Sequence, residues 1–161
     1  MSDWLLQVVK PFQERATNRQ QILQLDVSPE LPPLSSDIAG LERILSELLN
    51  NACKYTPPGQ RIILEARVSQ TGRSNLGEVV QLKVTNLGVK IPAEELPRIF
   101  DKFYRVPSSG PWKQGGTGLG LALVQKLVAH LDGSVRVEST ADQTCFTVEL
   151  PLKGQSMGIN R

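Results

Sequence analysis

Apolar residues recur along this chain with two different periods, one typical of helices and one typical of strands. The helical period covers three stretches, residues 3–19, 37–54 and 119–131. Strand patterns cover five segments, 21–27, 61–68, 79–85, 134–139 and 144–150. Residues 93–99 predict one further short helix, interrupted at Pro97. This set of elements predicts an α/β domain with five strands and about three long helices.

Proline and glycine divide these elements from one another. Pro11 lies inside the first helical pattern and predicts a kink or a break there. Asp37 is expected to cap the second helix. The composition of residues 69–77 is typical of an exposed hairpin loop, and that of 106–118 predicts a mobile loop. The pattern is lost after Pro151, so the end of the chain is expected to be a flexible tail.

Composition and charge exclude several classes of protein. With 161 residues, 40% of them hydrophobic and 21% charged, the chain is typical of one globular domain rather than a collagen-like, disordered or disulfide-stapled protein. A net charge of +2 does not indicate nucleic-acid binding. The sequence holds no apolar run of the roughly 20 residues that span a membrane, and its start does not resemble a signal peptide. A cytoplasmic protein without direct membrane contact is therefore expected.

Cysteine and histidine give little sign of a metal site. The two cysteines, Cys53 and Cys145, have no CxxC spacing, and a single histidine cannot form a multi-histidine centre. Both cysteines are therefore expected to be reduced thiols buried in the protein.

The helix around Asn51 has two distinct faces. At 100° per residue, one arc of its surface is entirely apolar and is expected to face the core. That arc consists of Leu41, Ile44, Leu45, Leu48, Leu49 and Ala52. Glu47, Asn51 and Lys54 share a second, polar arc, with Tyr55 at its border. Such a stripe is usually a solvated face, but an amide oxygen beside a carboxylate also suits Mg²⁺, and a lysine one turn on suits phosphate.

A glycine-rich segment, residues 115–120, leads directly into the last predicted helix. Glycines let backbone N–H groups approach an anion, and a helix N-terminus adds its unpaired N–H groups. The segment is therefore either a phosphate site or simply a flexible lid. Its spacing matches neither the dinucleotide-binding fingerprint nor the P-loop.

Four segments, taken together, resemble the motifs of sensor histidine kinases, in that family's order and at similar spacing. Residues 47–57 (ELLNNACKYTP) resemble the N box, and residues 86–91 (NLGVKI) lie where the first glycine box belongs. Residues 99–105 (IFDKFYR) resemble the F box, and residues 116–123 (GTGLGLAL) resemble the second glycine box. The resemblance covers roughly residues 3–151.

The resemblance implies the ATP-binding catalytic domain that histidine kinases share in outline with gyrase, the Hsp90 chaperones and MutL. The implied fold is a Bergerat-type α/β (α+β) two-layer sandwich, a mixed five-stranded sheet with about three helices on one face. Residues 21–152 would form this domain, 1–20 an opening helix or a remnant of a dimerisation module, and 153–161 the tail. The implied activity is transfer of the γ-phosphoryl group of Mg²⁺-ATP to a histidine on a separate dimerisation domain, with a response regulator as further partner.

The resemblance also assigns roles by matching position. Asn51 would ligate Mg²⁺, Lys54 would contact phosphate oxygens, Tyr55 would line the adenine and Arg105 would approach the γ-phosphate. Glu47 is expected either to orient the incoming imidazole or to polarise a water. The other implied nucleotide-binding positions are Asn86, Gly88, Ile91, Phe103, Gly116, Thr117, Gly118, Leu119 and Gly120.

Two phenylalanines of the F-box segment receive a double role. Phe100 and Phe103 are expected to anchor the lid and, at the same time, to pack in the core.

The sequence departs from the family pattern at three positions. Asn86 replaces the aspartate that recognises adenine, and loss of the charge-assisted hydrogen bond predicts ATP binding weaker by about 1–2 kcal/mol. Lys90 replaces a glycine, which would strain the backbone if that position needs a positive φ, and its stem would narrow the adenine pocket. Gln143 stands where the last glycine box begins and is expected only to alter a turn.

The phosphoacceptor pattern of the family is missing from this sequence. Its one histidine, His130, falls near the end of a predicted helix and is expected to act as a C-terminal cation. Three alternatives therefore stay open beside a histidine kinase: an ATPase clamp in which Glu47 activates water, a degenerate nucleotide-responsive module, and a serine kinase of the anti-sigma type. The sequence does not indicate the sensed signal, the cognate regulator or the oligomeric state.

Overall fold

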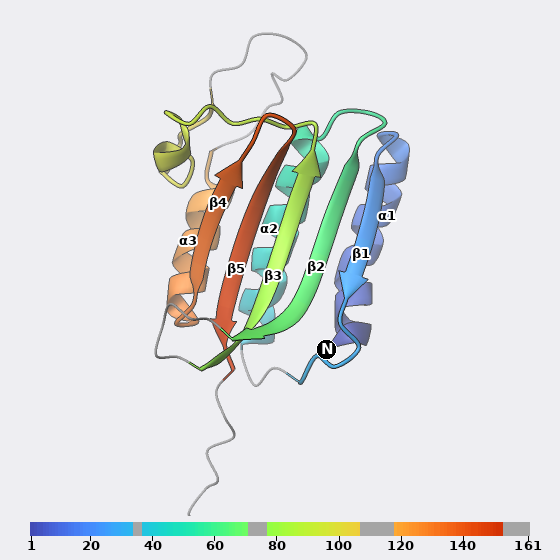
Figure 1. Ribbon diagram of the computed structural model, residues 1–161, viewed down its shortest axis with the longest axis vertical. Helices are drawn as coiled ribbons and strands as arrows, with labels where there is room; N and C mark the ends of the chain where they lie inside the picture. Colours follow the sequence, from blue (N-terminus) through green and yellow to red (C-terminus); the bar gives the residue numbers. More distant parts are fainter. Residues whose placement is uncertain (34–36, 71–76, 107–117, 153–161) are drawn as a thin grey trace, which may run out of the picture.

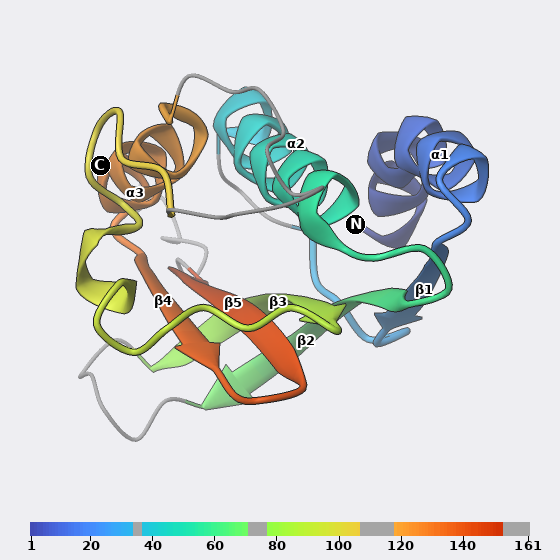
Figure 2. The ribbon, with the colours of Figure 1, turned by 90° about the horizontal axis from the view of Figure 1, so that it is seen from above.

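The computed structural model of the chain describes residues 1–33, 37–70, 77–106 and 118–152. In this part of the chain a five-stranded sheet forms one layer and three α-helices form a second layer on one of its faces (Figures 1 and 2). The mixed two-layer sandwich predicted from the sequence is thereby confirmed. The predicted flexible tail, 153–161, and most of the predicted mobile loop lie outside the described residues.

The helices and strands follow the predicted segments closely. The α-helices are α1 (Ser2–Asn18), α2 (Ile38–Tyr55) and α3 (Gly120–His130). The strands are β1 (Ile22–Val27), β2 (Arg61–Gln70), β3 (Glu78–Leu87), β4 (Ser134–Ser139) and β5 (Gln143–Pro151). The N-terminus of α2 is capped as predicted, because a side-chain oxygen of Asp37 accepts the backbone N–H of Gly40 at 3.1 Å.

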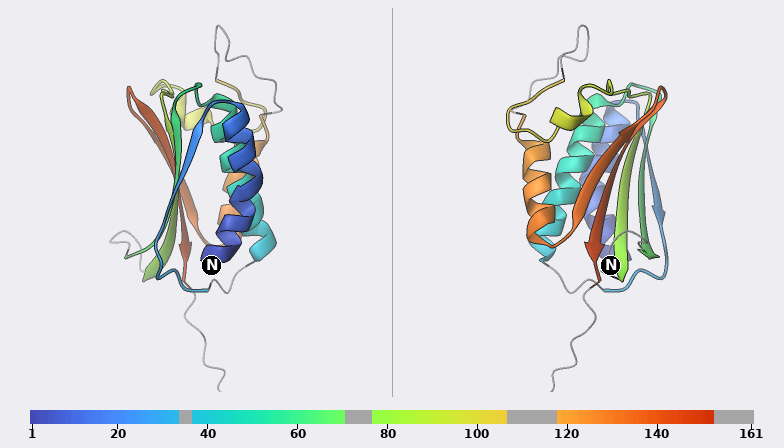
Figure 3. Two further views of the ribbon diagram at one scale, coloured as in Figure 1. Left: turned by 90° about the vertical axis from the view of Figure 1, so that its right-hand side faces the viewer. Right: turned by 60° about the vertical axis from the view of Figure 1, so that its left-hand side comes forward.

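The strand order is β1-β2-β3-β5-β4. Only β1 and β2 run parallel, with Leu23 opposite Ile62, and the other three pairs are antiparallel. The parallel pair follows from α2, which connects the end of β1 to the start of β2 as a crossover. The sheet is twisted, and all three helices stack on the same side of it (Figure 3).

Burial between the two layers follows the apolar arc of α2. Every residue of that arc is at most 3% exposed, and Ile44, Leu45 and Leu49 are completely buried. They pack in one cluster with sheet residues such as Leu64, Val84 and Phe146. The arc predicted to face the core therefore does so, which leaves the polar stripe of α2 on the flank of the helix.

Two local predictions differ in part from the structure. The helix is not broken at Pro11, since α1 runs without interruption from Ser2 to Asn18. Burial of Leu5, Val8, Val9 and Ala16 on both sides of the proline offsets the backbone hydrogen bond that proline cannot donate. The predicted helix over 93–99 is only a 3₁₀ turn, Leu96–Arg98, because Pro97 has no backbone N–H to donate to the carbonyl of Ala93, as an α-helix over this range would require.

The link between α1 and β1 is anchored on the C-terminal end of α2. Gln21 is buried, and its Nε2 donates to the backbone oxygens of Cys53 at 2.8 Å and Thr56 at 2.6 Å. These bonds satisfy carbonyls that a helix end leaves unpaired. Burial raises the pKa of the Cys53 thiol, an effect that the nearby Arg15 and Arg19 partly oppose. Cys53 is thus buried as predicted, whereas Cys145 is only partly buried.

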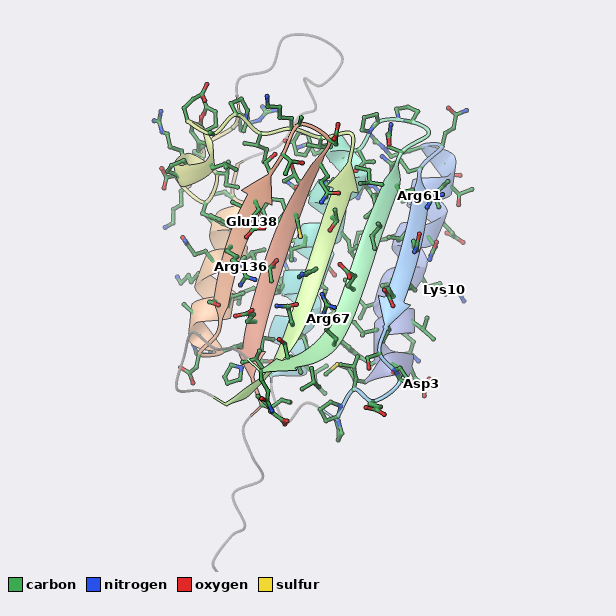
Figure 4. The ribbon with its side chains drawn as sticks, in the orientation of Figure 1. Asp3, Lys10, Arg61, Arg67, Arg136 and Glu138 are labelled. Carbon is green, nitrogen blue, oxygen red and sulfur yellow. The ribbon has the colours of Figure 1, made fainter. Side chains whose placement is uncertain are left out.

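The face of the sheet away from the helices is polar (Figure 4). A chain of side chains crosses four strands on it, from Arg67 through Gln81 and Glu149 to Arg136, with contacts of 3.4, 2.9 and 3.1 Å. Gln81 is only 8% exposed although no helix covers this face, because its side-chain amide is hydrogen-bonded to the side chains on both sides of it. None of the helices within the described residues is both long and apolar enough to cross a bilayer.

Candidate active site

A cavity of about 720 Å³ opens between the C-terminal half of α2, the ends of β3 and β5, and the N-terminus of α3. The segments 88–92 and 104–106 complete its wall. All of these lie at one end of the sandwich, the upper end in Figure 1. The cavity is therefore built from several parts of the sequence that are far apart in the chain.

The polar stripe of α2 forms one wall. Glu47, Asn51, Lys54 and Tyr55 all line the cavity, as their spacing predicts. The carboxylate of Glu47 is bonded at 2.8 Å to Arg43, one turn earlier in the helix. The ammonium of Lys54 lies 5.3 Å from the centre of the Tyr55 ring. The stripe is thus a cavity wall rather than a solvated helix face.

The sheet contributes a floor with one unsatisfied amide. Asn86, near the end of β3, is 2% exposed and lines the cavity. Its Oδ1 is buried without a hydrogen-bond partner among the described residues. An unpaired buried polar atom costs about 1–3 kcal/mol, so a ligand that bonds to this amide would recover that energy.

Beside Asn86, a hydroxyl network fixes the wall of the cavity. Thr144, the cross-strand neighbour of Asn86, donates from its hydroxyl to the backbone oxygen of Val89 at 2.9 Å. Ser139 lies 2.8 Å from the Thr144 hydroxyl and accepts the backbone N–H of Ile91 at 2.8 Å. Val89 and Ile91 are thereby held against β4 and β5.

The first glycine segment contains one residue in the left-handed region. Gly88 has a φ of +76° and donates its backbone N–H to the oxygen of Asp142 at 2.7 Å. Lys90 also lines the cavity, but it is not among the residues with positive φ, so the backbone strain considered for it is absent. Gln143 begins β5 and its oxygen accepts the N–H of Thr140, which closes the β4–β5 turn.

The base of the lid segment is closed by the main chain. Phe103 donates its backbone N–H to the oxygen of Gly118 at 3.0 Å, and both residues have positive φ, +65° and +71°. A Cβ on Gly118 would come within 2.7 Å of the Phe103 backbone, so only glycine fits there. Gly118 and Gly120 line the cavity, and Gly120 begins α3.

Several predicted positions fall elsewhere. Phe103 and Leu119 are not part of the cavity wall and are 71% and 38% exposed. Core packing of Phe103 was therefore a wrong prediction, because its left-handed backbone turns the ring outward. Phe100 does pack inward, edge-on to Phe146, with 6.3 Å between ring centres. Gly116 and Thr117 lie outside the described residues.

The structure adds residues that the motifs did not indicate. Arg15 reaches the cavity from α1, and its Nη1 donates to Oδ1 of Asn50, which also lines the cavity. Tyr104 contributes to the same wall, and the guanidinium carbon of Arg98 lies 4.9 Å from the centre of the Tyr104 ring. The spacing on α2 does place Asn50 next to Lys54, but Arg15 could be found only from the packing of α1.

The charge of the wall favours an anion. Among the described residues, four cations line the cavity, Arg15, Lys54, Lys90 and Arg105, against the single carboxylate of Glu47. Within the described ranges, no three or more histidine, cysteine, aspartate or glutamate side chains are grouped so that they could hold a metal ion. A cation bound here would therefore need ligands from a bound anion in addition to protein oxygens such as that of Asn51.

A family model places the chain among known proteins. Residues 36–154 match the model described as "Histidine kinase-, DNA gyrase B-, and HSP90-like ATPase". The matched range includes every predicted site residue. Arg15 and the whole of α1 and β1 lie outside it.

One similar relative is sensor histidine kinase CusS of Escherichia coli O157:H7. It is 41% identical over 121 residues, which are 75% of this chain and 24% of that protein. The chain thus spans about a quarter of the curated relative that it matches.

Solved structures share the same architecture. Mycobacterial sensor histidine kinase MprB superposes with a TM-score of 0.75 at 27% identity, over 94% of this chain and 95% of that one. Full-length ShkA, solved in complex with AMPPNP, superposes with a TM-score of 0.76 at 28% identity, over 92% of this chain and 29% of that one.

Proposed function

Because the chain belongs to the family of histidine kinase-, DNA gyrase B- and HSP90-like ATPases, we propose that it binds Mg²⁺-ATP in this cavity and transfers the γ-phosphoryl group to a histidine of a separate dimerisation domain. The observation that carries the proposal is the cavity itself, which joins a buried unpaired amide at Asn86 to a wall lined with four cations. A ligand with a hydrogen-bonding heterocycle at one end and several negative charges at the other fits both features.

The base and the phosphates have separate protein partners in this proposal. Asn86 bonds to the edge of the adenine, and Tyr55 and Ile91 supply apolar surface beside it. Lys54 and Arg105 neutralise phosphate charge, with backbone N–H groups at the start of α3 as further donors. Gly118 and Gly120 let the main chain approach the phosphates without a Cβ in between.

Asn51 is the proposed protein ligand of Mg²⁺. It lies one helical turn from Glu47 and next to Lys54 on the cavity wall, and an amide oxygen is a suitable ligand for a hard cation. Few protein oxygens lie nearby, which suits Mg²⁺ because this ion usually takes its other ligands from phosphates and waters. When bound, the ion would supply neutralisation of charge on the phosphates.

Catalysis in this arrangement is positioning and charge neutralisation by the chain's own side chains. Phosphoryl transfer needs little covalent chemistry from the protein, so fixed cations near the γ-phosphate are the main contribution. Arg105, at the base of the lid segment, is placed to supply that charge. Glu47 is proposed to orient the incoming imidazole, since its carboxylate lies beside Gly120 at the start of α3.

The acceptor is proposed to come from outside this chain. His130 is the last residue of α3, whose first residue lines the cavity. Eleven helical residues extend about 16 Å, so His130 is at the wrong end of the helix to receive the γ-phosphoryl group. A dimerisation domain that presents a histidine, a response regulator that receives the group from it, and a cytoplasmic location complete the proposal.

A radiolabelled-ATP assay tests this proposal. The chain alone is expected to acquire no label, whereas a matching dimerisation domain added in trans is expected to be labelled on its histidine in an acid-labile, base-stable bond. Label on His130 of the isolated chain would contradict the proposed external acceptor. Steady ATP hydrolysis without any acceptor, abolished by Glu47→Gln, would instead favour an ATPase in which Glu47 polarises water.

Arg15 is predicted to contact a nucleotide phosphate together with Lys54. Replacing Arg15 by Gln should weaken ATP and ADP binding by about tenfold or more and leave adenosine binding unchanged, because a hydrogen bond to a charged group contributes about 1.5–3 kcal/mol. Titration calorimetry at two salt concentrations measures this loss. Arg19→Gln is the matched control, since Arg19 directly follows α1 and bonds to the Lys54 backbone oxygen at 3.3 Å without lining the cavity. Equal losses in both variants would show a general charge effect instead.

A further inference from the structure

We infer that the cavity accepts purine nucleotides with either an amino group or an oxygen at position 6 of the base, so that inosine triphosphate binds nearly as well as ATP. This inference rests on the proposed function, because it names the class of base that the same cavity takes. It comes from the chemistry of one side chain, the amide of Asn86, and from what surrounds that amide.

The amide lies in a corner of the cavity where two apolar side chains, Phe146 and Ile91, also line the wall. Asn86 lies directly opposite Thr144 in the antiparallel pair of β3 and β5. Phe146, two residues further along β5 and thus on the same face of the sheet, also lines the cavity. Ile91 closes the corner on the other side, and its backbone N–H donates to the Ser139 hydroxyl, which holds it in place. A flat heterocycle with a hydrogen-bonding edge suits this corner.

Hydrogen bonds from neighbouring side chains do not fix the orientation of the amide. Oδ1 of Asn86 has no partner among the described residues. The nearest hydroxyl in the network, that of Thr144, gives its only proton to the oxygen of Val89. In the contact of 2.8 Å between Ser139 and Thr144, the proton must therefore come from Ser139. Thr144 is thus already engaged, and no hydrogen bond from the described residues holds the amide in one of its two orientations.

An amide that can face either way matches two kinds of purine. Facing adenine, Oδ1 accepts from the 6-amino group while Nδ2 donates to N1. Turned over against hypoxanthine, Nδ2 donates to the 6-oxygen while Oδ1 accepts from the N1 proton. An ionised carboxylate only accepts hydrogen bonds, so at this position it would favour the amino group and place an oxygen against the 6-oxygen. The Asn86 amide therefore does not select adenine over 6-oxopurines by repulsion, as a carboxylate at this position would.

The experiment compares dissociation constants of ATP and inosine triphosphate in the intact chain and in Asn86→Asp. The wild-type chain is expected to bind the two nucleotides within about tenfold of each other. The aspartate variant is expected to bind ATP more tightly and inosine triphosphate more weakly, so that the ratio rises at least tenfold, since charge-assisted and neutral bonds differ by this order. Asn50→Asp is the control, because it adds the same charge to the cavity wall away from β3 and should weaken both nucleotides equally.

A second variant keeps the test decisive if a buried aspartate impairs folding. Asn86→Ala removes both hydrogen-bonding atoms and should weaken ATP and inosine triphosphate by similar factors. A wild-type preference for ATP of a hundredfold or more would overturn the inference and leave nucleotide binding intact. Loss of ATP binding alone in Asn86→Ala would overturn it too. If neither nucleotide binds, the proposed function itself fails.

Discussion

Replacing Asn51 by alanine is expected to abolish phosphoryl transfer to an acceptor domain, with a loss of at least about a hundredfold. The reason is that Mg²⁺ would lose its proposed protein ligand, and charge neutralisation at the phosphates is the main source of catalysis. Asn51 lies on the polar stripe of α2, outside the buried apolar arc. The variant should therefore unfold at nearly the wild-type temperature, with a stability change below about 1 kcal/mol. Transfer is measured with labelled ATP, and folding by thermal denaturation.

The metal dependence of binding separates this explanation from a simple loss of contact. Wild-type protein is expected to lose ATP affinity when Mg²⁺ is removed with EDTA. Asn51→Ala should bind ATP weakly with or without the ion, because its protein ligand is gone. A variant that still gains as much affinity from Mg²⁺ as the wild type would contradict the role of Asn51.

Gly118→Ala is expected to weaken ATP binding by at least about tenfold and to slow transfer with it. Alanine in the left-handed region costs about 1–2 kcal/mol, and its Cβ would also lie 2.7 Å from the carbonyl carbon of Phe103. The Phe103–Gly118 hydrogen bond would then open, and the start of α3 would move relative to α2. Calorimetric titration with ATP measures the loss.

Gly59 offers a matched control for this substitution. Its φ is +84°, but an added Cβ would have no atom within 4 Å. Gly59→Ala should therefore show the conformational cost of about 1–2 kcal/mol in unfolding experiments and no loss of ATP affinity. Equal ATP affinities for Gly118→Ala and the wild type would show that the closure between Phe103 and Gly118 does not shape the cavity.

The layers of the fold could be predicted because each element carries a strong local signal. The apolar arc of α2 has the full helical period, and its members are the buried ones. The strand order could not be read from the sequence, since it depends on pairings between distant residues such as Val84 with Phe146. Pro11 was misjudged for a related reason, because burial on both sides of it outweighs its local preference.

The site was predictable where its residues share one element or one motif. Glu47, Asn51, Lys54 and Tyr55 are neighbours by helical geometry alone. Arg15 is 35 residues from its partner Asn50, and only the packing of α1 against α2 brings them together. The outward position of Phe103 depends on a positive φ that phenylalanine rarely adopts.

The contacts of the α1–β1 link predict that a fragment without α1 and β1 is less stable than the chain that keeps them. A fragment cut to the family match, 36–154, would lose Gln21 from the end of α2 and four buried side chains of α1. In the structure β1 pairs with β2, so the fragment would leave that edge of β2 without a partner strand. Unpaired strand edges promote association between chains. The range that the family model matches is therefore expected to be less stable on its own than the chain with α1 and β1, and fragments for experiments should keep both elements.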